Sequence, residues 1–397
     1  MKAVEIKKDV YWVGAIDYNV RNFHGYITPR GTTYNAYLVV DEKTALIDTV
    51  KSPFKEELLA RIRSVMDPAE LDYLIVNHVE MDHSGSSAAV MEAAPEAQVI
   101  ATGKGMEFLH AHYHGSEEWD IKAVDKGDSL KLGKRSLQFI PSPMLHWPDT
   151  MFTYCPEERI LFSNDGFGQH IATPQRFHDE VEDRDIIDEA KKYYANILLP
   201  FSSLVSKKLA ELKDVPVDIV CPSHGVAFRR KEDIEQVVSA YSRWAAGESL
   251  DKAVIIYDTM YSSTEKMARA IEDGLIDGGV DTRFYNLRIS DWSEIAKEVL
   301  DAKAIVVGSA TLNNGPLPTV AGFLTYLKSL RPKGKIAAAF GSYGWGGGAV
   351  KVITEYLEST GIELVEEPIQ TRFVPPEEVL SACWDMGARI AKKIKER

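Results

Sequence analysis

The chain has 397 residues, too many for one ordinary hydrophobic core, and this length predicts two domains or three. Hydrophobic residues make up 45% and charged residues 26% of the sequence, as in a soluble globular protein. The formal net charge of -13 argues against a nucleic-acid partner, because there is no basic stripe to meet phosphates.

The cysteines and the N-terminus indicate a reducing compartment. Cys155, Cys221 and Cys383 lie far apart and form no CxxC pair, which excludes a four-thiolate iron–sulfur or rubredoxin-type site. Residues 1–6 lack the apolar core of a signal peptide, and no apolar stretch is long enough to span a bilayer. We therefore expect a cytoplasmic protein with no membrane partner.

The first half of the chain predicts a mixed sheet structure with helices outside. Strands are expected over 10–13, 33–40, 44–48, 71–76, 97–101, 136–140, 159–162 and 217–220. Helices are expected over 54–65, 87–92, 183–194, 203–212 and 234–244. This pattern is typical of an αββα sandwich, and we place the end of this domain at Ser249, giving domains 1–249 and 250–397.

The second half has a strict alternation of strands and helices. Strand-like runs at 253–257, 282–286, 304–308 and 336–340, and a weaker one at 363–365, alternate with helices at 266–273, 292–300, 320–330, 349–358 and 376–394. Such alternation predicts a doubly wound parallel sheet, and five strands fit the flavodoxin-like order.

Ligand-type residues follow several strands of the first domain. His78, Glu80 and Asp82 alternate after the strand at 71–76, so an extended segment would project them to one side, with His83 just after. Three further candidates each follow a later apolar strand: His146, Asp165 and His224. Seven ligands are too many for one tetrahedral zinc and suit two metals that share a carboxylate. Imidazole and carboxylate ligands without thiolate are common around non-haem iron that handles oxygen. The alternative for residues 78–83 is a solvated charged loop that binds no metal.

Three loops at one edge of the second sheet predict an FMN site. The first opens a helix, where hydroxyls and free amides can hold a phosphate, although such residues are also ordinary helix caps. The later two carry glycine and aromatic residues that can approach and cover a flavin ring. The candidate residues are Thr259, Met260, Tyr261, Ser262, Ser263 and Thr264, then Thr311, Leu312, Asn313 and Asn314, then Ser342, Tyr343, Gly344, Trp345 and Gly346. The sequence lacks the aspartate after the third strand that a receiver domain needs, and it lacks the glycine fingerprint after the first strand that a nicotinamide-binding fold needs.

The motifs together resemble one family. The region 10–224 is similar to the metallo-β-lactamase superfamily, but Glu80 stands where its hydrolases carry the second histidine of HxHxDH. The pattern HxExDH, followed by the contexts of His146, Asp165 and His224, resembles the flavodiiron proteins over essentially the whole chain. The resemblance implies a metallo-β-lactamase-like αββα sandwich followed by a flavodoxin-like doubly wound parallel sheet.

The resemblance also implies a ligand set and a pocket. One iron is expected at His78, Glu80 and His146, and the other at Asp82, His83 and His224, with Asp165 bridging them. His24 and Tyr193 resemble residues that line the family's substrate pocket, and a surface or packing role is the alternative for each.

Other histidines are not expected to bind metal. His110, His112 and His114 lie at a predicted helix C-terminus without carboxylate neighbours, and His170 and His178 are expected in loops.

The implied activity is the reduction of O2 to water, of NO to N2O, or both. A diferrous pair and a reduced FMN each store two electrons, which together suffice for the four-electron reduction of O2. The sequence to Arg397 contains no rubredoxin-type module, so we expect a separate donor such as rubredoxin or reduced deazaflavin. The resemblance further implies a head-to-tail homodimer or a dimer of dimers.

Two other functions are compatible with parts of the sequence. The main alternative is a binuclear zinc hydrolase with an appended flavodoxin-like domain, which a carboxylate at Glu80 argues against. The other is an electron carrier with a vestigial metal domain.

Overall fold

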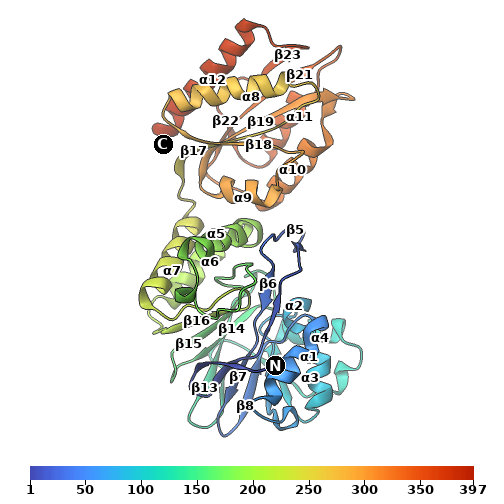
Figure 1. Cartoon of the computed structure of the whole chain (residues 1–397), viewed down its shortest axis with the longest axis vertical. Helices are drawn as coiled ribbons and strands as arrows, with labels where there is room; N and C mark the ends of the chain where they lie inside the picture. The colour runs from blue at the N-terminus through green and yellow to red at the C-terminus, as the bar shows by residue number, and fades with distance from the viewer. The chain divides into compact units, whose positions relative to one another are not determined.

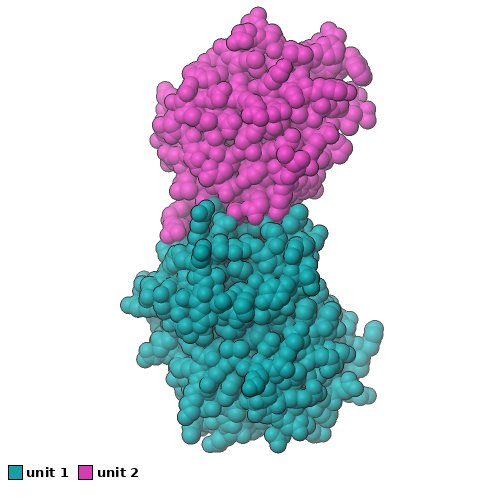
Figure 2. Space-filling model, viewed as in Figure 1, with its two compact units in different colours: residues 1–193, 203–242 teal, residues 194–202, 243–397 magenta.

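The computed structural model describes all residues, 1–397, as two compact units (Figure 2). The first unit contains residues 1–193 and 203–242, and the second contains residues 194–202 and 243–397. The domain boundary after Ser249 remains a prediction.

The first unit is built on two sheets. The first sheet has the order β1-β2-β7-β8-β9-β10-β11. Its strands are β1 (Val4–Lys7), β2 (Val10–Trp12), β7 (Tyr37–Val40), β8 (Thr44–Ile47), β9 (Tyr73–Ile75), β10 (Gln98–Thr102) and β11 (Ile121–Val124). The second sheet has the order β12-β13-β14-β15-β16. Its strands are β12 (Ser129–Lys131), β13 (Ser136–Pro141), β14 (Met151–Cys155), β15 (Ile160–Asn164) and β16 (Ile219–Pro222). Two small ribbons, β3 (Ala15–Asp17) with β6 (Thr32–Tyr34) and β4 (Asn22–Phe23) with β5 (Tyr26–Ile27), complete the strands.

Helices cover the outer faces of these sheets. The helices are α1 (Lys55–Arg63), α2 (Met81–Ser84), α3 (Ser87–Ala93), α4 (Gly103–His112), α5 (Asp183–Tyr193), α6 (Ser202–Leu212) and α7 (Lys231–Ala246). Ile62 of α1, Val90 of α3 and Leu109 of α4 pack in one core with Leu74 of β9, whereas α5, α6 and α7 lie beside the second sheet (Figure 1). A second core, which includes Ile75 and Phe162, fills the space between the sheets. This arrangement confirms the predicted αββα sandwich.

This unit differs from the sequence prediction in several strands and in the segment after β9. Strand β14, in which all five residues are buried, had no strand prediction. The segment after β9 is not extended over residues 78–82, since Asp82 and His83 lie in the helical turn α2. Ser84 fixes this turn by donating a 2.6 Å hydrogen bond to the carbonyl of Val79.

The second unit is a doubly wound parallel sheet with the order β18-β17-β19-β21-β22. Its strands are β17 (Leu250–Asp258), β18 (Asp281–Asn286), β19 (Ala302–Leu312), β21 (Ile336–Tyr343) and β22 (Glu363–Leu364), with β20 (Gly315–Pro316) paired to β19 and β23 (Ile369–Arg372) paired to β21. The order of the five parallel strands confirms the flavodoxin-like prediction. The weak fifth strand is split, because β22 and β23 pair with opposite ends of β21.

Helices cover both faces of this sheet. Its helices are α8 (Ser263–Asp277), α9 (Trp292–Leu300), α10 (Pro318–Leu330), α11 (Ala349–Ser359) and α12 (Glu377–Lys395). Met267 of α8 and Met386 of α12 share one core, and Ile295 of α9, Phe323 of α10 and Ile353 of α11 share the other. No helix in the chain combines the length and the apolar character that crossing a bilayer requires.

Candidate flavin pocket and metal centre

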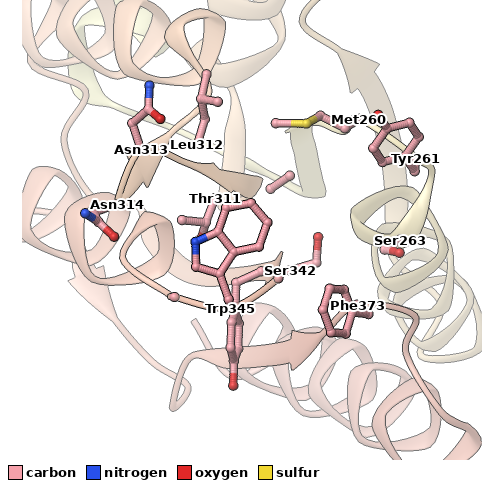
Figure 3. Close-up of a pocket in the computed structure, with 14 residues that line it drawn as sticks. Met260, Tyr261, Ser263, Thr311, Leu312, Asn313, Asn314, Ser342, Trp345 and Phe373 are labelled. Atoms are coloured by element: carbon pink, nitrogen blue, oxygen red, sulfur yellow. The ribbon is translucent and has the colours of Figure 1, made fainter.

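A cavity of about 580 Å³ lies at the carboxyl edge of the second unit's sheet, where α/β folds bind ligands. The loops after β17, β19 and β21 line it, with Met260 and Tyr261 on one side and Thr311 and Trp345 across from them (Figure 3). The lining residues are Met260, Tyr261, Ser263, Ala310, Thr311, Leu312, Asn313, Asn314, Ser342, Tyr343, Gly344, Trp345, Gly346 and Phe373.

Most of the residues predicted for this pocket line it, and three do not. Thr259 and Ser262 are outside the lining set, and Thr264 is buried with its hydroxyl 2.9 Å from that of Ser342. Phe373 was not predicted, because it follows the split fifth strand, which had only a weak signal.

The cavity has the chemistry that a flavin mononucleotide requires. Ser263 starts α8, whose first amides have no helical partners and can bind a phosphate without a lysine. Tyr261 and Trp345 are 90% and 94% exposed at the cavity, which leaves their rings free to cover a planar ligand. Gly348 permits the two later loops to pack, since a Cβ there would lie 2.1 Å from the carbonyl oxygen of Asn314.

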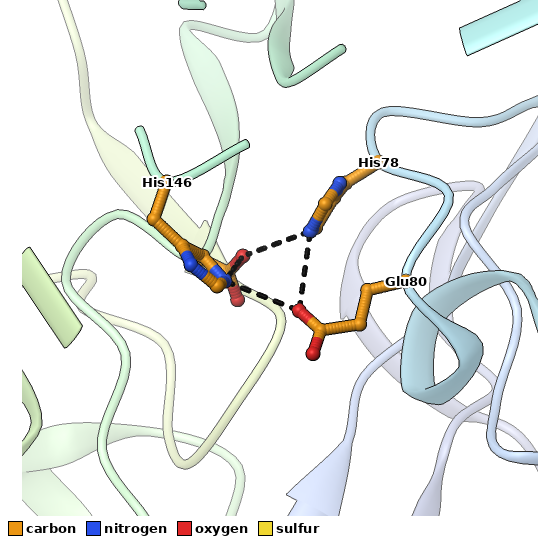
Figure 4. Close-up of side chains that lie close together, drawn as sticks. His78, Glu80 and His146 are labelled. Carbon is orange, nitrogen blue, oxygen red and sulfur yellow. Dashed lines mark hydrogen bonds and ion pairs between the residues drawn. The ribbon is translucent and has the colours of Figure 1, made fainter. Parts of the chain in front are cut away.

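The first unit brings all seven predicted ligand residues into one pocket. His78, Glu80 and His146 form its first part (Figure 4). Oε2 of Glu80 lies 3.3 Å from Nε2 of His78 and 3.1 Å from Nε2 of His146. Oδ2 of Asp165 lies 3.8 Å and 3.6 Å from the same two nitrogens.

Asp82, His83 and His224 form the second part of the pocket. Oδ2 of Asp82 lies 3.0 Å from Nε2 of His224 and 3.4 Å from Nε2 of His83. Oδ1 of Asp165 lies 3.1 Å from Nε2 of His83 and 3.7 Å from Nε2 of His224. The two oxygens of Asp165 therefore face different pairs of imidazoles.

Unsatisfied buried atoms show that this pocket fits metal ions. Buried polar atoms normally find hydrogen-bond partners. Here both carboxylate oxygens of Asp82, both ring nitrogens of His83, Oδ2 of Asp165 and Nε2 of His224 are buried without such a partner. Because imidazole and carboxylate atoms lie within 4.8 Å of one another in overlapping groups, the arrangement suits two cations better than one.

The carboxylates of the pocket are ionised, because their surroundings lower their pKa values. Burial opposes ionisation of Glu80, but hydrogen bonds from His146 and His78 outweigh it and lower the pKa of Glu80 to about 2. Burial likewise opposes ionisation of Asp165 and Asp82, yet the neighbouring imidazoles, with His83 contributing most, together hold the pKa of each well below its ordinary value. Anionic oxygens therefore face the pocket at neutral pH, as cation binding requires.

A buried carboxylate outside the pocket connects two ligand loops. Asp48 accepts hydrogen bonds from the backbone amide of Asn77 (2.8 Å), from the side-chain amide of Asn77 (3.1 Å) and from that of Asn164 (3.3 Å). Asn77 precedes His78, and Asn164 precedes Asp165. Burial raises the pKa of Asp48 to about 6. The position of Asp48 at the end of β8 gave no sequence signal of this role.

Three further side chains border the pocket. Nδ1 of His24 lies 3.5 Å from Oε1 of Glu80, and the phenol of Tyr193 donates a 2.9 Å hydrogen bond to Asp165. His170, expected only in a loop, lies with its ring centre 4.9 Å from that of His224. Burial, followed by the charges of His224 and His24, holds the pKa of His170 well below its ordinary value, so its ring is neutral.

The remaining histidines lie elsewhere. His110 and His112 are in the last turn of α4, and Nδ1 of His110 lies 3.0 Å from the hydroxyl of Ser116. His178 is buried, with its Nε2 2.9 Å from Oδ1 of Asp183 and its Nδ1 3.1 Å from Oδ2 of Asp233. None of these belongs to a group that could hold a metal ion.

Comparison with known proteins finds relatives across the full length. The family described as ODP family beta lactamase matches residues 32–225, and the flavodoxin family matches residues 255–387. A nitric oxide reductase from Moorella thermoacetica is 52% identical, covering 99% of each chain. The structure of rubredoxin oxygen:oxidoreductase from Desulfovibrio gigas matches with a TM-score of 0.97 at 41% identity, covering 100% of this chain and 99% of that one. A flavodiiron protein from Giardia intestinalis matches with a TM-score of 0.97 at 38% identity, covering 100% and 97%.

Proposed function

Because the chain belongs to the flavodiiron proteins, we propose that it reduces O2 to water, NO to N2O, or both, at a non-haem di-iron centre. FMN in the second unit relays the electrons, which come from an external donor. Iron and FMN, when bound, supply the redox chemistry of the reaction. The protein residues hold these groups, position the substrate and supply protons.

The observation that carries this proposal is the position of Asp165 between two sets of ligands. Its Oδ2 faces His78 and His146, and its Oδ1 faces His83 and His224. We assign His78, Glu80 and His146 to one iron, and Asp82, His83 and His224 to the other, with Asp165 bridging them. The shared carboxylate and the absence of thiolate support iron with open positions for a small substrate.

His24 and Tyr193 are assigned to the substrate side of the centre. The side chain of His24 is 6% exposed, and its Nε2 lies 3.8 Å from Oδ2 of Asp82. Burial opposes its protonation, but the neighbouring carboxylates of Asp82, Glu80 and Asp165 together outweigh burial and raise the pKa of His24. His24 can therefore hold a proton beside the centre, while Tyr193 orients the bridging carboxylate.

Metal and flavin analysis tests this function against the zinc-hydrolase alternative. We expect the purified protein to contain close to two irons and one FMN per chain. Zinc as the only metal, together with hydrolysis of a thioester or phosphodiester, would contradict the proposal.

We further propose that two copies assemble head to tail, so that the flavin of one chain serves the irons of its partner. A groove of about 410 Å³ opens beside His146 and supports this arrangement. Its lining is almost entirely apolar: Phe108, Ala111, His112, Met144, His146, Trp147 and Pro148. The proposed occupant is the flavin edge of a second copy, where Tyr261 and Trp345 present large exposed rings.

Complementation between inactive variants tests the dimer. Ser263→Asp is designed to lose FMN, and Glu80→Gln is designed to lose one iron. If flavin and irons cooperate across the dimer, mixing the two variants under subunit exchange restores part of the activity. A mixture that stays inactive, although hybrid dimers form, would contradict the arrangement.

The electron donor and the cellular location are also proposals. We propose rubredoxin or a reduced deazaflavin as donor, a cytoplasmic location, and neither nucleic-acid nor membrane partners. Three unpaired, buried cysteines support a reducing compartment: Cys155, Cys221 and Cys383. Steady-state reduction assays with each donor decide between the two, since the true donor saturates at micromolar concentration and the other does not.

A further inference from the structure

A buried carboxylate outside the ligand set holds the outward nitrogen of His78. Nδ1 of His78 lies 3.1 Å and 3.0 Å from the two oxygens of Asp149, and neither side chain is exposed. A carboxylate can only accept, so Nδ1–H of His78 is the donor. This fixes the ring tautomer that leaves Nε2, the nitrogen facing Glu80, free to bind metal.

Asp149 is itself held firmly and reaches the backbone next to His78. Its Oδ2 accepts a 2.7 Å hydrogen bond from the amide of Val79. Its carbonyl accepts a 2.9 Å hydrogen bond from the hydroxyl of Thr102, which also caps the first turn of α4. One carboxylate therefore sets both the ring of His78 and the turn that follows it.

The other three imidazoles of the pocket have no such partner. Nδ1 of His224 donates to the carbonyl of Thr33 at 2.7 Å, a neutral acceptor. Nδ1 of His83 is buried without a hydrogen-bond partner, and the side chain of His146 is 12% exposed and bonds only Glu80 through Nε2. A carboxylate partner makes an imidazole a stronger electron donor to its metal than a carbonyl does. The two halves of the centre are therefore unequal.

We propose that Asp149 is a positioning residue that makes the iron at His78 electronically distinct from, and more tightly held than, the iron at His83 and His224. This inference rests on the proposed di-iron function and deepens it. The protein ligands of the two iron sites are otherwise alike in kind. The hydrogen bond from His78 to Asp149 would therefore account for the difference in electronic character and affinity between the two irons.

Asp149→Asn tests the assignment with almost no change in volume. The substitution puts a neutral amide in place of the anionic carboxylate beside Nδ1 of His78, so the ring loses its carboxylate partner. We expect about a 10- to 100-fold loss of affinity for one iron of the pair. In 57Fe-enriched, reduced protein, one of two Mössbauer doublets should shift or disappear while the other is unchanged.

Asp48→Asn is the matched control. Asp48 is also buried and also anchors ligand loops, through Asn77 and Asn164, but it makes no hydrogen bond to an imidazole. We expect this variant to leave the doublet of the iron at His78 at its wild-type position.

The possible outcomes distinguish a failure of the role given to Asp149 from a failure of the proposed di-iron function. Equal shifts of both doublets in Asp149→Asn, no shift, or the same change in Asp48→Asn would overturn the role of Asp149. Wild-type protein without a pair of irons would contradict the proposed function itself. Should Asp149→Asn fail to fold, the wild-type protein still decides, because a chelator should remove its two irons at clearly different rates, and a single rate overturns the inference.

Discussion

The phenol of Tyr193 donates a 2.9 Å hydrogen bond to Oδ1 of Asp165, the carboxylate placed between the two halves of the pocket. Both side chains are buried. Burial, and then the charge of Asp165, hold the pKa of Tyr193 well above its ordinary value, so the phenol keeps its proton and remains a donor. As the last residue of α5, Tyr193 joins this helix to the centre of the site.

Removing this donor should destabilise the metal-free protein. Tyr193→Phe leaves a buried, ionised oxygen without its phenol, at a cost of about 1.5–3 kcal/mol in the free energy of unfolding. Tyr154→Phe is the control, because the phenol of Tyr154 donates to a neutral carbonyl, that of Pro216 (2.5 Å). The control should lose only about 0.5–1.5 kcal/mol. Urea unfolding at pH 7 measures both, and equal losses would contradict the role given to Asp165.

Replacing Glu80 should remove one iron and leave the flavin. In Glu80→Gln a neutral amide takes the place of the anionic oxygen that faces His78 and His146. We expect iron to fall from about two to about one per chain, because a neutral amide binds the cation more weakly than a carboxylate. Glu92→Gln, on the exposed side of α3, is the control and should keep both irons. Elemental analysis that finds full iron in Glu80→Gln would remove Glu80 from the ligand set.

The metal-free protein should lose stability as the pH rises above neutrality. Burial favours the neutral ring of His83, but Asp82 and Asp165 outweigh it and raise the pKa of His83 to about 9. Because this pKa exceeds the unfolded value of about 6.5, the stabilisation is fully present below about pH 6.5 and is lost as the pH rises to 9. The loss amounts to about 3 kcal/mol at most.

Thermal unfolding between pH 6 and 9 measures this loss. His83→Gln should flatten the profile, whereas His114→Gln, at an exposed position in the turn after α4, should leave it unchanged. A wild-type slope in His83→Gln would show that other groups carry the pH dependence.

A negative charge at the start of α8 should weaken FMN binding. Ser263 lines the cavity at the helix N-terminus, so the carboxylate of Ser263→Asp would repel a phosphate and occupy the free amides. We expect at least about a tenfold loss of FMN affinity, since like charges held together cost more than 1.4 kcal/mol. Ser359→Asp, at the far end of α11, is the control. Fluorescence titration of flavin-free protein measures both, and unchanged affinity in Ser263→Asp would place the phosphate elsewhere.

The sequence predicted those features in which an apolar strand runs directly into ligand-type residues. Ile75 precedes His78, Phe162 precedes Asp165 and Val220 precedes His224, and the fold brings these three ligand-type residues together. The second unit was equally clear, because each parallel strand is an apolar run followed by an amphipathic helix.

Other features have no local signature. Asp149 resembles a solvated loop residue in sequence, and Asp48 is the polar end of a predicted strand. Only the tertiary fold buries them against His78 and Asn77. His170 reaches the pocket through the loop after β15 in the same way. The helical turn at Asp82 was missed because alternating ligands fit an extended strand equally well, and the hydrogen bonds that decide between them involve residues outside the motif.

Rapid mixing of the fully loaded, anaerobically reduced protein with O2, and separately with NO, tests the central claim most directly. Flavin absorbance reports the reoxidation. We predict fast reoxidation by at least one of the two gases, and slow reoxidation by both in Glu80→Gln, although that variant keeps its FMN. Comparable slow reoxidation of the wild-type protein by both gases, or a Glu80→Gln variant as fast as the wild type, would contradict the account.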